Sequence, residues 1–310
     1  MKIHTSFESL EGVKNPVVTI GTFDGVHRGH QTILSRLQEI ARTVDGESVL
    51  LSFFPHPRMV LHPEDHRVEL LSSPDEKALL LSAAGIDHLM IYPFSHEFSR
   101  MSAFDYVRDI LVTGLNTHTV VVGYDHRFGR NREGNHDTLI EMGEIFGFRV
   151  EEIPAKVIDQ NNVSSTKIRQ ALQSGRITEA NEYLGYNYSI SGKVSHGDKI
   201  GRTLGFPTAN ILTDYPHKLI PSNGIYAVKV HAGGNSFNGV LNIGVRPTVN
   251  SNNRRSVEVY ILNFEKEIYD EKISVELLSY LREEKKFGSI DELKQEIQND
   301  IVKAKNWFLD

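Results

Sequence analysis

The sequence predicts an α/β protein, in which a first half built on a parallel sheet is followed by a smaller antiparallel β domain with a terminal helix. Its 310 residues exceed the roughly 100–200 residues of one domain. The first half alternates apolar runs with amphipathic stretches, whereas the later segments are short, β-rich and broken by Gly and Pro. We therefore predict two domains, residues 1–185 and residues 186–310.

The first half begins with an apolar strand at 17–20 and an amphipathic helix at 29–42. Ser73, Pro74 and Glu76 form the start signal of a later helix, with an N-cap, a first-turn proline and a capping box. Continuous apolar strands that alternate with such helices are typical of a parallel sheet covered on both faces. The predicted strands are 17–20, 48–54, 86–92, 119–122 and 149–153, and the predicted helices are 29–42, 73–84, 102–111, 137–146 and 165–184.

The second half is β-rich from Ser189 onward. Several short strands with turns between them predict a small antiparallel barrel or a sandwich. Ser289 and Glu292 form a capping box that opens a terminal helix. The clearest strand-like segments are 226–231, 237–243, 257–263 and 272–281, and the apolar face of the helix comprises Ile290, Leu293, Ile297, Ile301 and Ala304.

Composition excludes several classes of function. The chain has no cysteine, which excludes disulfides, thiolate zinc sites and cysteine nucleophiles and fits a reducing cytoplasm. Its net charge of −6, with 40 acidic and 34 basic residues and no basic run, argues against a nucleic-acid partner. No segment reaches the roughly 18 apolar residues of a membrane span, and the first residues lack a signal-peptide core. We expect a cytoplasmic protein that binds neither nucleic acid nor membrane.

The segment from Gly21 to His30, GTFDGVHRGH, joins a buried strand to a helix. Its glycines allow a ligand close to the backbone, and the N–H groups of a helix N-terminus attract phosphate. His27 and His30 are three residues apart, so both can face the same phosphates and stabilise charge on a reacting oxygen. A glycine-rich turn with two surface histidines is the alternative, but the strand–loop–helix setting favours phosphate chemistry. Neither a Walker motif nor a GxGxxG motif is present.

A second motif, VSSTKIR at 163–169, lies at the start of a predicted helix. The hydroxyls of Ser165 and Thr166 can donate to phosphates, and the guanidinium of Arg169 can bind them with two nitrogens. Read alone, the motif also fits a capped helix with a surface arginine.

These motifs resemble known ones. The first looks like the HxGH signature of nucleotidylyltransferases, and its longer form resembles the N-terminal domain of the bacterial riboflavin kinase/FMN adenylyltransferase family. The second is similar to that family's ISSTxIR motif. The segment GYDHRFG at 123–129 resembles a third family segment, although the family usually has phenylalanine where His126 stands. FFPHP at 53–57 resembles the family's flavin-side loop, or is simply a strand ended by prolines.

The second half carries GRTLGFPTAN at 201–210, which is similar to the riboflavin kinase signature GxxLGFPTAN. PSNGIY, NIGVRPT and VEVY follow in the order of that kinase domain. Read alone, the first of these segments is also consistent with a structural turn. The resemblance covers essentially the whole chain and implies a Rossmann-like nucleotidylyltransferase domain followed by a β-barrel kinase domain.

The resemblance also implies roles for individual residues. Glu258 is expected to act as base toward the ribityl 5′-hydroxyl of riboflavin, and Thr208 and Asn210 to hold Mg²⁺ with oxygen ligands. His27 and His30 are the expected catalytic residues of adenylyl transfer. Residues expected to bind ATP or its phosphates are Gly21, Phe23, Asp24, Gly25, Gly29, Asp125, Ser165, Thr166, Arg169, Gly201, Gly205 and Pro207, and those expected beside the flavin are Phe54, Pro55, Pro57 and Arg282.

The implied function is the two-step synthesis of FAD. The C-terminal domain is expected to phosphorylate riboflavin with Mg-ATP, and the N-terminal domain to transfer an adenylyl group from ATP to FMN, releasing pyrophosphate. One alternative keeps only one activity, and another is a flavin-binding module without turnover. A transferase for a different nucleotide ester shares the HxGH motif but leaves the kinase signature unexplained. The expected partners are small molecules, and the sequence leaves open whether the chain is a monomer or a weak oligomer.

Overall fold

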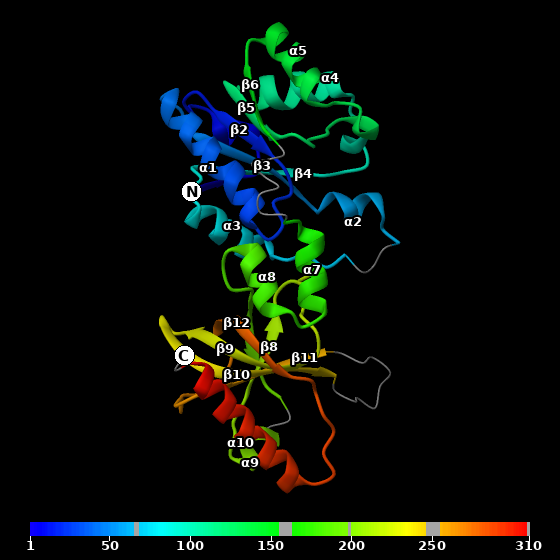
Figure 1. Cartoon of the computed structure of the whole chain (residues 1–310). Coiled ribbons are helices and arrows are strands. Elements are labelled where there is room, and N and C mark those ends of the chain that lie inside the picture. Colours follow the sequence, from blue (N-terminus) through cyan, green and yellow to red (C-terminus); the bar gives the residue numbers. More distant parts are fainter. Residues whose placement is uncertain (65–67, 155–162, 198–199, 246–254, 309–310) are drawn as a thin grey trace. The chain divides into compact units, whose positions relative to one another are not determined.

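The computed structural model describes residues 1–64, 68–154, 163–197, 200–245 and 255–308 (Figure 1). The chain divides into two compact units, Met1–Ser164 and Ser165–Asp310, and each is described by itself. The sequence places the division between the two catalytic domains later, after residue 185, and that functional boundary stays a prediction.

The first unit is built on a six-stranded sheet with the order β1-β4-β3-β2-β5-β6. Every neighbouring pair of strands is parallel, which confirms the predicted sheet. The edge strand β1 was not predicted, because three residues are too few to show a periodic pattern. The strands are β1 (Lys2–His4), β2 (Val17–Ile20), β3 (Ser48–Phe54), β4 (His88–Pro93), β5 (Thr119–Gly123) and β6 (Arg149–Ile153).

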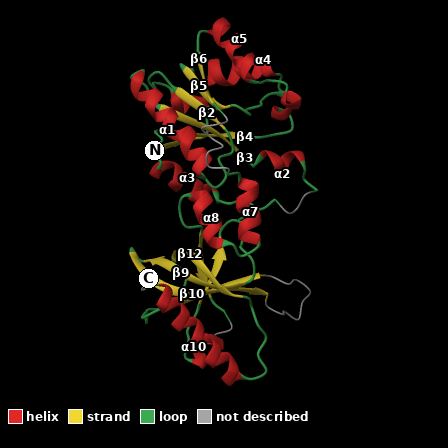
Figure 2. Cartoon of the chain, viewed as in Figure 1, coloured by secondary structure: helices red, strands yellow, loops and turns green. Residues whose placement is uncertain are grey.

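Side chains from successive strand positions pack into two cores, one on each face of this sheet. Val18 and Leu51 belong to one core, and their neighbours Val17 and Leu50 belong to the other. Helices cover both faces (Figure 2), because a parallel sheet must bury both. The described helical elements are α1 (Arg28–Thr43), α2 (Pro57–Leu61), α3 (Pro74–Ala83), α4 (Ala103–Asp105), a π-helical segment (Tyr106–Gly114) and α5 (His136–Phe146), with short 3₁₀ turns at Phe7–Leu10, Phe98–Arg100 and Arg130–Arg132.

The second unit is a closed antiparallel barrel with the strand order β10-β11-β8-β7-β12-β9. Closure decides between the barrel and the sandwich that the sequence left open. The strands are β7 (Ser189–Ser195), β8 (Ala209–Thr213), β9 (Gly224–Ala232), β10 (Asn235–Val245), β11 (Arg255–Ile261) and β12 (Lys272–Arg282).

Helices accompany the barrel before, within and after its strands. The predicted helix 165–184 is two helices, α7 (Ser165–Gln173) and α8 (Ile177–Leu184), because Gly175 between them adopts a left-handed φ of 72°. A short helix, α9 (Ile200–Leu204), precedes β8. The terminal helix α10 (Ile290–Trp307) begins at its N-cap Ser289 as predicted and packs on β9, β10 and β12. In the part of the chain that the structure describes, no helix is both long and apolar enough to cross a membrane.

Candidate active sites

The loop from Gly21 to His27 lies at the carboxyl end of β2 and leads into α1. Strands β2 and β5 are neighbours in the sheet. The strand order reverses between them, because β3 and β4 lie on the far side of β2 and β6 lies on the far side of β5. Ligands bind in the crevice at such a switch point. Asp125 follows β5 at the same edge. The topology therefore brings two predicted nucleotide-binding segments together.

The backbone of this loop adopts sparsely populated conformations. Phe23 and Val26 have left-handed φ angles of 46° and 36°, which cost about 1–3 kcal/mol each at non-glycine residues. Both side chains are buried, and Gly25 between them adopts a φ of 80°. Surrounding contacts must therefore hold the loop in this shape.

Asp24 supplies one of these contacts. Its buried carboxylate accepts hydrogen bonds from the amide of Leu71 at 2.9 Å and the amide of Ser72 at 3.2 Å. The Ser72 hydroxyl in turn accepts from the amide of Gly25 at 3.2 Å. These bonds make Asp24 an anchor between the loop and the segment before α3, and its predicted contact with ATP stays a prediction.

His27 and His30 stack, with ring centroids 3.7 Å apart and an interplanar angle of 14°. His27 is the N-cap of α1, and its Nδ1 accepts from the His30 amide at 3.3 Å, so the proton of the neutral ring lies on Nε2. Burial, and then the nearby charges of His27 and Lys77, hold the pKa of His30 well below its usual value. Its buried Nδ1 has no hydrogen-bond partner among the described residues. The pair thus presents two fixed imidazoles, of which His30 is neutral at pH 7.

The loop after β5 carries the residue that departs from the family pattern. His126 stacks on Phe128 with ring centroids 5.9 Å apart, and burial lowers the pKa of His126 to about 4. Its imidazole is therefore neutral at pH 7 and packs as an aromatic ring. Asp125 beside it is exposed.

The predicted flavin-side residues follow β3, next to β2 in the sheet. Phe54 ends the strand with its side chain 45% exposed, and Pro55 follows it. Pro57 opens α2, whose N-cap His56 accepts from the Arg58 amide at 3.2 Å. The prolines do end a strand, and an exposed aromatic ring lies at the same edge as the loop 21–27.

In the second unit, α7 begins at Ser165, so Ser165, Thr166 and Arg169 occupy its first turns as the motif predicts. Ser165 and Arg169 are partly buried and Thr166 is exposed. Their proposed contact with ATP stays a prediction.

The predicted kinase residues form a polar row on one face of the barrel strands. Glu258 on β11 lies directly opposite Asn210 on β8 and Asn242 on β10, so the three side chains share one face. Val257 and Val259 point the other way and are buried. Thr208 Oγ1 donates to Glu258 Oε2 at 3.4 Å. Hydroxyl, amide and carboxylate oxygens suit Mg²⁺, so the residues present fit the predicted ion.

Glycine geometry explains much of the segment 201–207. A Cβ on Gly201 would lie 2.4 Å from the Phe206 carbonyl oxygen, and the Phe206 amide donates to the Gly201 carbonyl at 2.8 Å. Gly205 has a φ of 89°. These glycines are required by the turn that precedes Pro207 and Thr208, and their phosphate contacts stay predictions.

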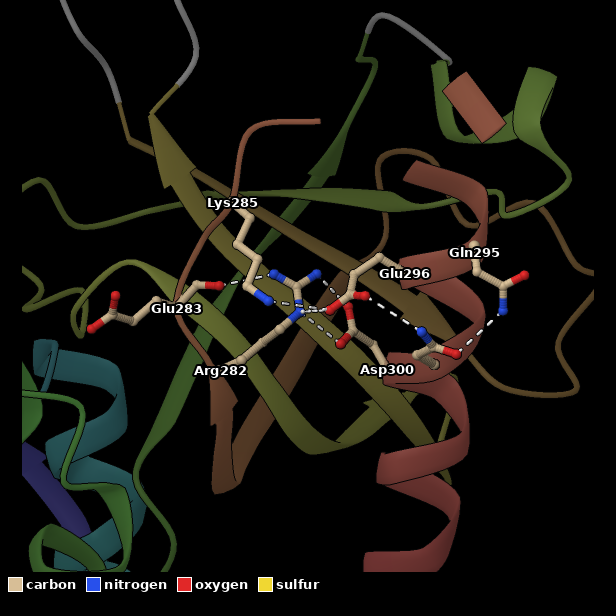
Figure 3. Close-up of polar contacts among 7 residues, drawn as sticks. Arg282, Glu283, Lys285, Gln295, Glu296 and Asp300 are labelled. Atoms are coloured by element: carbon tan, nitrogen blue, oxygen red, sulfur yellow. Dashed lines mark hydrogen bonds and ion pairs between the residues drawn. The ribbon is translucent and has the colours of Figure 1, made fainter. Parts of the chain in front are cut away.

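Arg282 ends β12 and is bound by the terminal helix (Figure 3). Its Nε and Nη2 donate to the two carboxylate oxygens of Asp300 at 2.8 and 2.6 Å, and Glu296 lies 3.2 Å from Nε. The side chains of Arg282 and Asp300 are 11% and 3% exposed. The guanidinium thus anchors α10 to the barrel, while its predicted flavin contact is untested.

Comparison with known proteins assigns one family to each half of the chain. A FAD synthetase family model matches residues 10–167, and a riboflavin kinase family model matches residues 184–308. The chain belongs to the bifunctional riboflavin kinase/FMN adenylyltransferase family. It is 37% identical to the member from Haemophilus influenzae over 99% of this chain and 97% of that one. It is 39% identical to the member from Pseudomonas fluorescens over 93% of this chain and 92% of that one.

A solved structure shares this family fold. The crystal structure described as a macrolide-efflux protein from Streptococcus pneumoniae has a TM-score of 0.87 and 28% identity, and covers 99% of both chains. The efflux description belongs to that protein, whereas the family models and the curated relatives agree on flavin chemistry.

Sequence reasoning missed two residues of these sites. Asn242 lies opposite Glu258, and its buried Oδ1 has no hydrogen-bond partner among the described residues, which fits a polar ligand on this face. Its place in the segment NIGVRPT was the available signal. Lys77 on α3 reaches the loop 21–27, but in the sequence it is an ordinary helical lysine.

Proposed function

We propose that the chain carries both activities of its family. The second unit phosphorylates riboflavin to FMN with Mg-ATP, and the HxGH site of the first unit adenylylates FMN to FAD. The observation that carries this proposal is the presence of two unlike constellations in one chain: stacked imidazoles at a helix N-terminus and a carboxylate in an oxygen-rich row. A chain with one activity, or a module without turnover, is not favoured.

In the kinase site, Glu258 takes the proton from the 5′-hydroxyl of riboflavin as that oxygen attacks the γ-phosphorus of ATP, and the bond to the bridging oxygen breaks to release ADP. The Thr208 hydroxyl orients the carboxylate from one side. Thr208 and Asn210 would hold Mg²⁺, which when bound neutralises charge on the ATP phosphates. Gly201, Gly205 and Pro207 shape the turn that presents these two ligands.

In the adenylyltransferase site, an FMN phosphate oxygen attacks the α-phosphorus of ATP and pyrophosphate leaves. His27 and His30 donate N–H groups to the charge that builds on the phosphoryl oxygens, so neither ring has to change its protonation state. Because the reaction joins two anions, fixed donors matter more than acid–base catalysis. Residues of the first unit proposed to bind ATP beside the histidines are Gly21, Phe23, Asp24, Gly25, Gly29 and Asp125. The motif residues Ser165, Thr166 and Arg169 are proposed to bind ATP phosphates.

Phe54, Pro55 and Pro57 supply the flavin-side surface of this site, and Arg282 is assigned to the flavin end of the kinase site. The chain works in the cytoplasm, which its lack of cysteine supports. Its partners are riboflavin, FMN and ATP.

Single substitutions should separate the two activities. We expect His27→Ala to lower FAD formation from FMN about 100-fold or more, because it removes one donor to the transition state, and to leave FMN formation unchanged. Glu258→Ala should stop FMN formation and leave FAD formation intact when FMN is supplied. Chromatography of the flavins measures both rates, and loss of both activities in either folded variant would contradict two independent sites.

A further inference from the structure

Lys77 is a partly buried lysine that none of the sequence motifs includes. Its ammonium donates to the hydroxyl of Ser52 at 2.9 Å and to the carbonyl of Thr22 at 3.2 Å. Burial lowers the pKa of Lys77, and the nearby carboxylate of Asp24 opposes that effect. Lysines usually keep their charge in water because removing it is costly, so the partial burial of this ammonium requires an explanation.

The two bonds join three elements. Ser52 lies on β3, Thr22 lies in the loop that follows β2, and Lys77 itself lies on α3. The next residue of that loop is Phe23, whose left-handed backbone has to be held in place. Asp24 also anchors the loop, to the amides of Leu71 and Ser72. A cation and an anion from neighbouring positions therefore fix the same short loop.

Lys77 also acts on the histidine pair through its charge. Together with burial and His27, the Lys77 ammonium holds down the pKa of His30. The charged or titratable groups that face His30 are His27 and Lys77, and Asp24 lies beside Lys77. A second positive charge in the stack would be repelled by His27 when that ring is protonated, and by the Lys77 ammonium.

We propose that Lys77 is a positioning residue for adenylyl transfer, which holds the loop 21–27 in shape and places its ammonium near the ring of His30. The inference rests on the proposed function, in which His27 and His30 act on the phosphates. It assigns to α3 a role in the chemistry in addition to covering the sheet.

Three substitutions separate the hydrogen bonds from the charge. Lys77→Met removes both, Lys77→Gln keeps a donor without the charge, and Lys77→Arg keeps the charge. Lys14→Met is the matched control, because Lys14 belongs to the same unit but is exposed and paired with Asp45 at the surface. The readouts are kcat and KM for FAD formation, the rate of FMN formation, and the titration of His30 followed by NMR of ¹³C-labelled histidine, with His30→Gln to assign its signal.

We expect Lys77→Met and Lys77→Gln to lower kcat for FAD formation about ten- to a hundred-fold, as misplaced catalytic groups do, and to spare FMN formation. The His30 titration midpoint should rise in both variants and stay low in Lys77→Arg and Lys14→Met. If Lys77→Met fails to fold, as judged by circular dichroism, the comparison of Lys77→Gln with Lys77→Arg decides.

Unchanged FAD kinetics in Lys77→Gln would overturn the proposal. So would equal losses in Lys77→Gln and Lys77→Arg with an unmoved His30 midpoint, because that result describes a purely structural lysine. His30→Ala separates the two levels of the argument: if this variant still makes FAD at the normal rate, the proposed role of the histidines fails, whatever the Lys77 variants do.

Discussion

At the scale of single residues, His126 shows how a polar side chain can occupy an aromatic position. Burial keeps its ring neutral, with a pKa of about 4, and the ring stacks on Phe128. Its Nε2 is buried and has no hydrogen-bond partner among the described residues. The imidazole therefore fills the place of a phenylalanine, at the cost of one buried nitrogen.

We expect His126→Phe to stabilise the first unit by about 1–3 kcal/mol at pH 7, because it removes an unsatisfied buried polar atom and keeps the ring contact. Hydrogen exchange of the β5 amides measures this local free energy of unfolding. Asp125→Asn, an exposed change in the same loop, is the control. A large loss of stability in His126→Phe would show that the nitrogen makes a bond that the protein needs.

His126 and two other histidines predict that the stability of the fold depends on pH. The pKa values of His4, His30 and His126 are lowered in the folded chain, mainly by burial. In the unfolded chain these histidines bind protons near pH 6.5, so the folded state is penalised as the pH falls. The stability is fully present above about pH 6.5 and is lost progressively toward pH 4.

His126 alone should account for about 3 kcal/mol of that loss, from its shift between 6.5 and about 4. Hydrogen exchange of the sheet amides between pH 7 and pH 5 checks the direction. His126→Phe should flatten the dependence, and an identical slope in this variant would contradict the assignment.

At the scale of elements, the ion pair between Arg282 and Asp300 joins β12 to α10. Removing Asp300 takes away both oxygens of its carboxylate and leaves the buried guanidinium with Glu296 as its remaining carboxylate partner. We expect Asp300→Ala to cost the second unit up to about 3 kcal/mol, the lower end of the cost of leaving a buried charge with no partner. Trp307 is the only tryptophan and ends α10, so its fluorescence during urea unfolding reports this step.

Asp291→Ala is the matched control, since Asp291 is an exposed acid in the first turn of the same helix and should cost less than about 1 kcal/mol. Equal effects of the two substitutions would show that the pair contributes little. The comparison also tests the flavin role of Arg282: if the guanidinium contacts flavin, Arg282→Ala should raise KM for riboflavin more than Asp300→Ala does.

Helices and strands were predictable where their apolar residues recur periodically. The alternation of apolar runs and helices predicted the parallel sheet, and the capping box at Ser73 predicted the start of α3. The break at Gly175 was missed, because the helical periodicity on its two sides looks continuous. The π-helical turn at Tyr106–Gly114 has no signal that we can identify in the sequence.

The candidate sites were predictable only in part, because some of their residues have partners that are distant in the sequence. The histidine pair and the oxygen-rich strand residues come from short motifs, whose members are close in sequence or joined by strand register. Lys77 and Asp24 reach partners that are distant along the chain, Thr22 and Leu71 respectively. Only the fold brings such pairs together, so no short motif contains both partners.

At the scale of the whole molecule, one chain joins two units whose reactions are consecutive. The product of the barrel unit, FMN, is the substrate of the unit with the HxGH site. Each unit holds the catalytic groups predicted for its own step: a carboxylate with oxygen ligands in one, and stacked imidazoles on an anchored loop in the other. The two activities should therefore be chemically independent, with FMN as their common intermediate.

The most direct test is a time course with the purified protein, riboflavin, ATP and Mg²⁺, in which the flavins are separated by chromatography. The account predicts that FMN appears first and FAD follows at its expense. FMN that accumulates without FAD would contradict the assignment of the HxGH site, and riboflavin that stays unconverted would contradict the account as a whole.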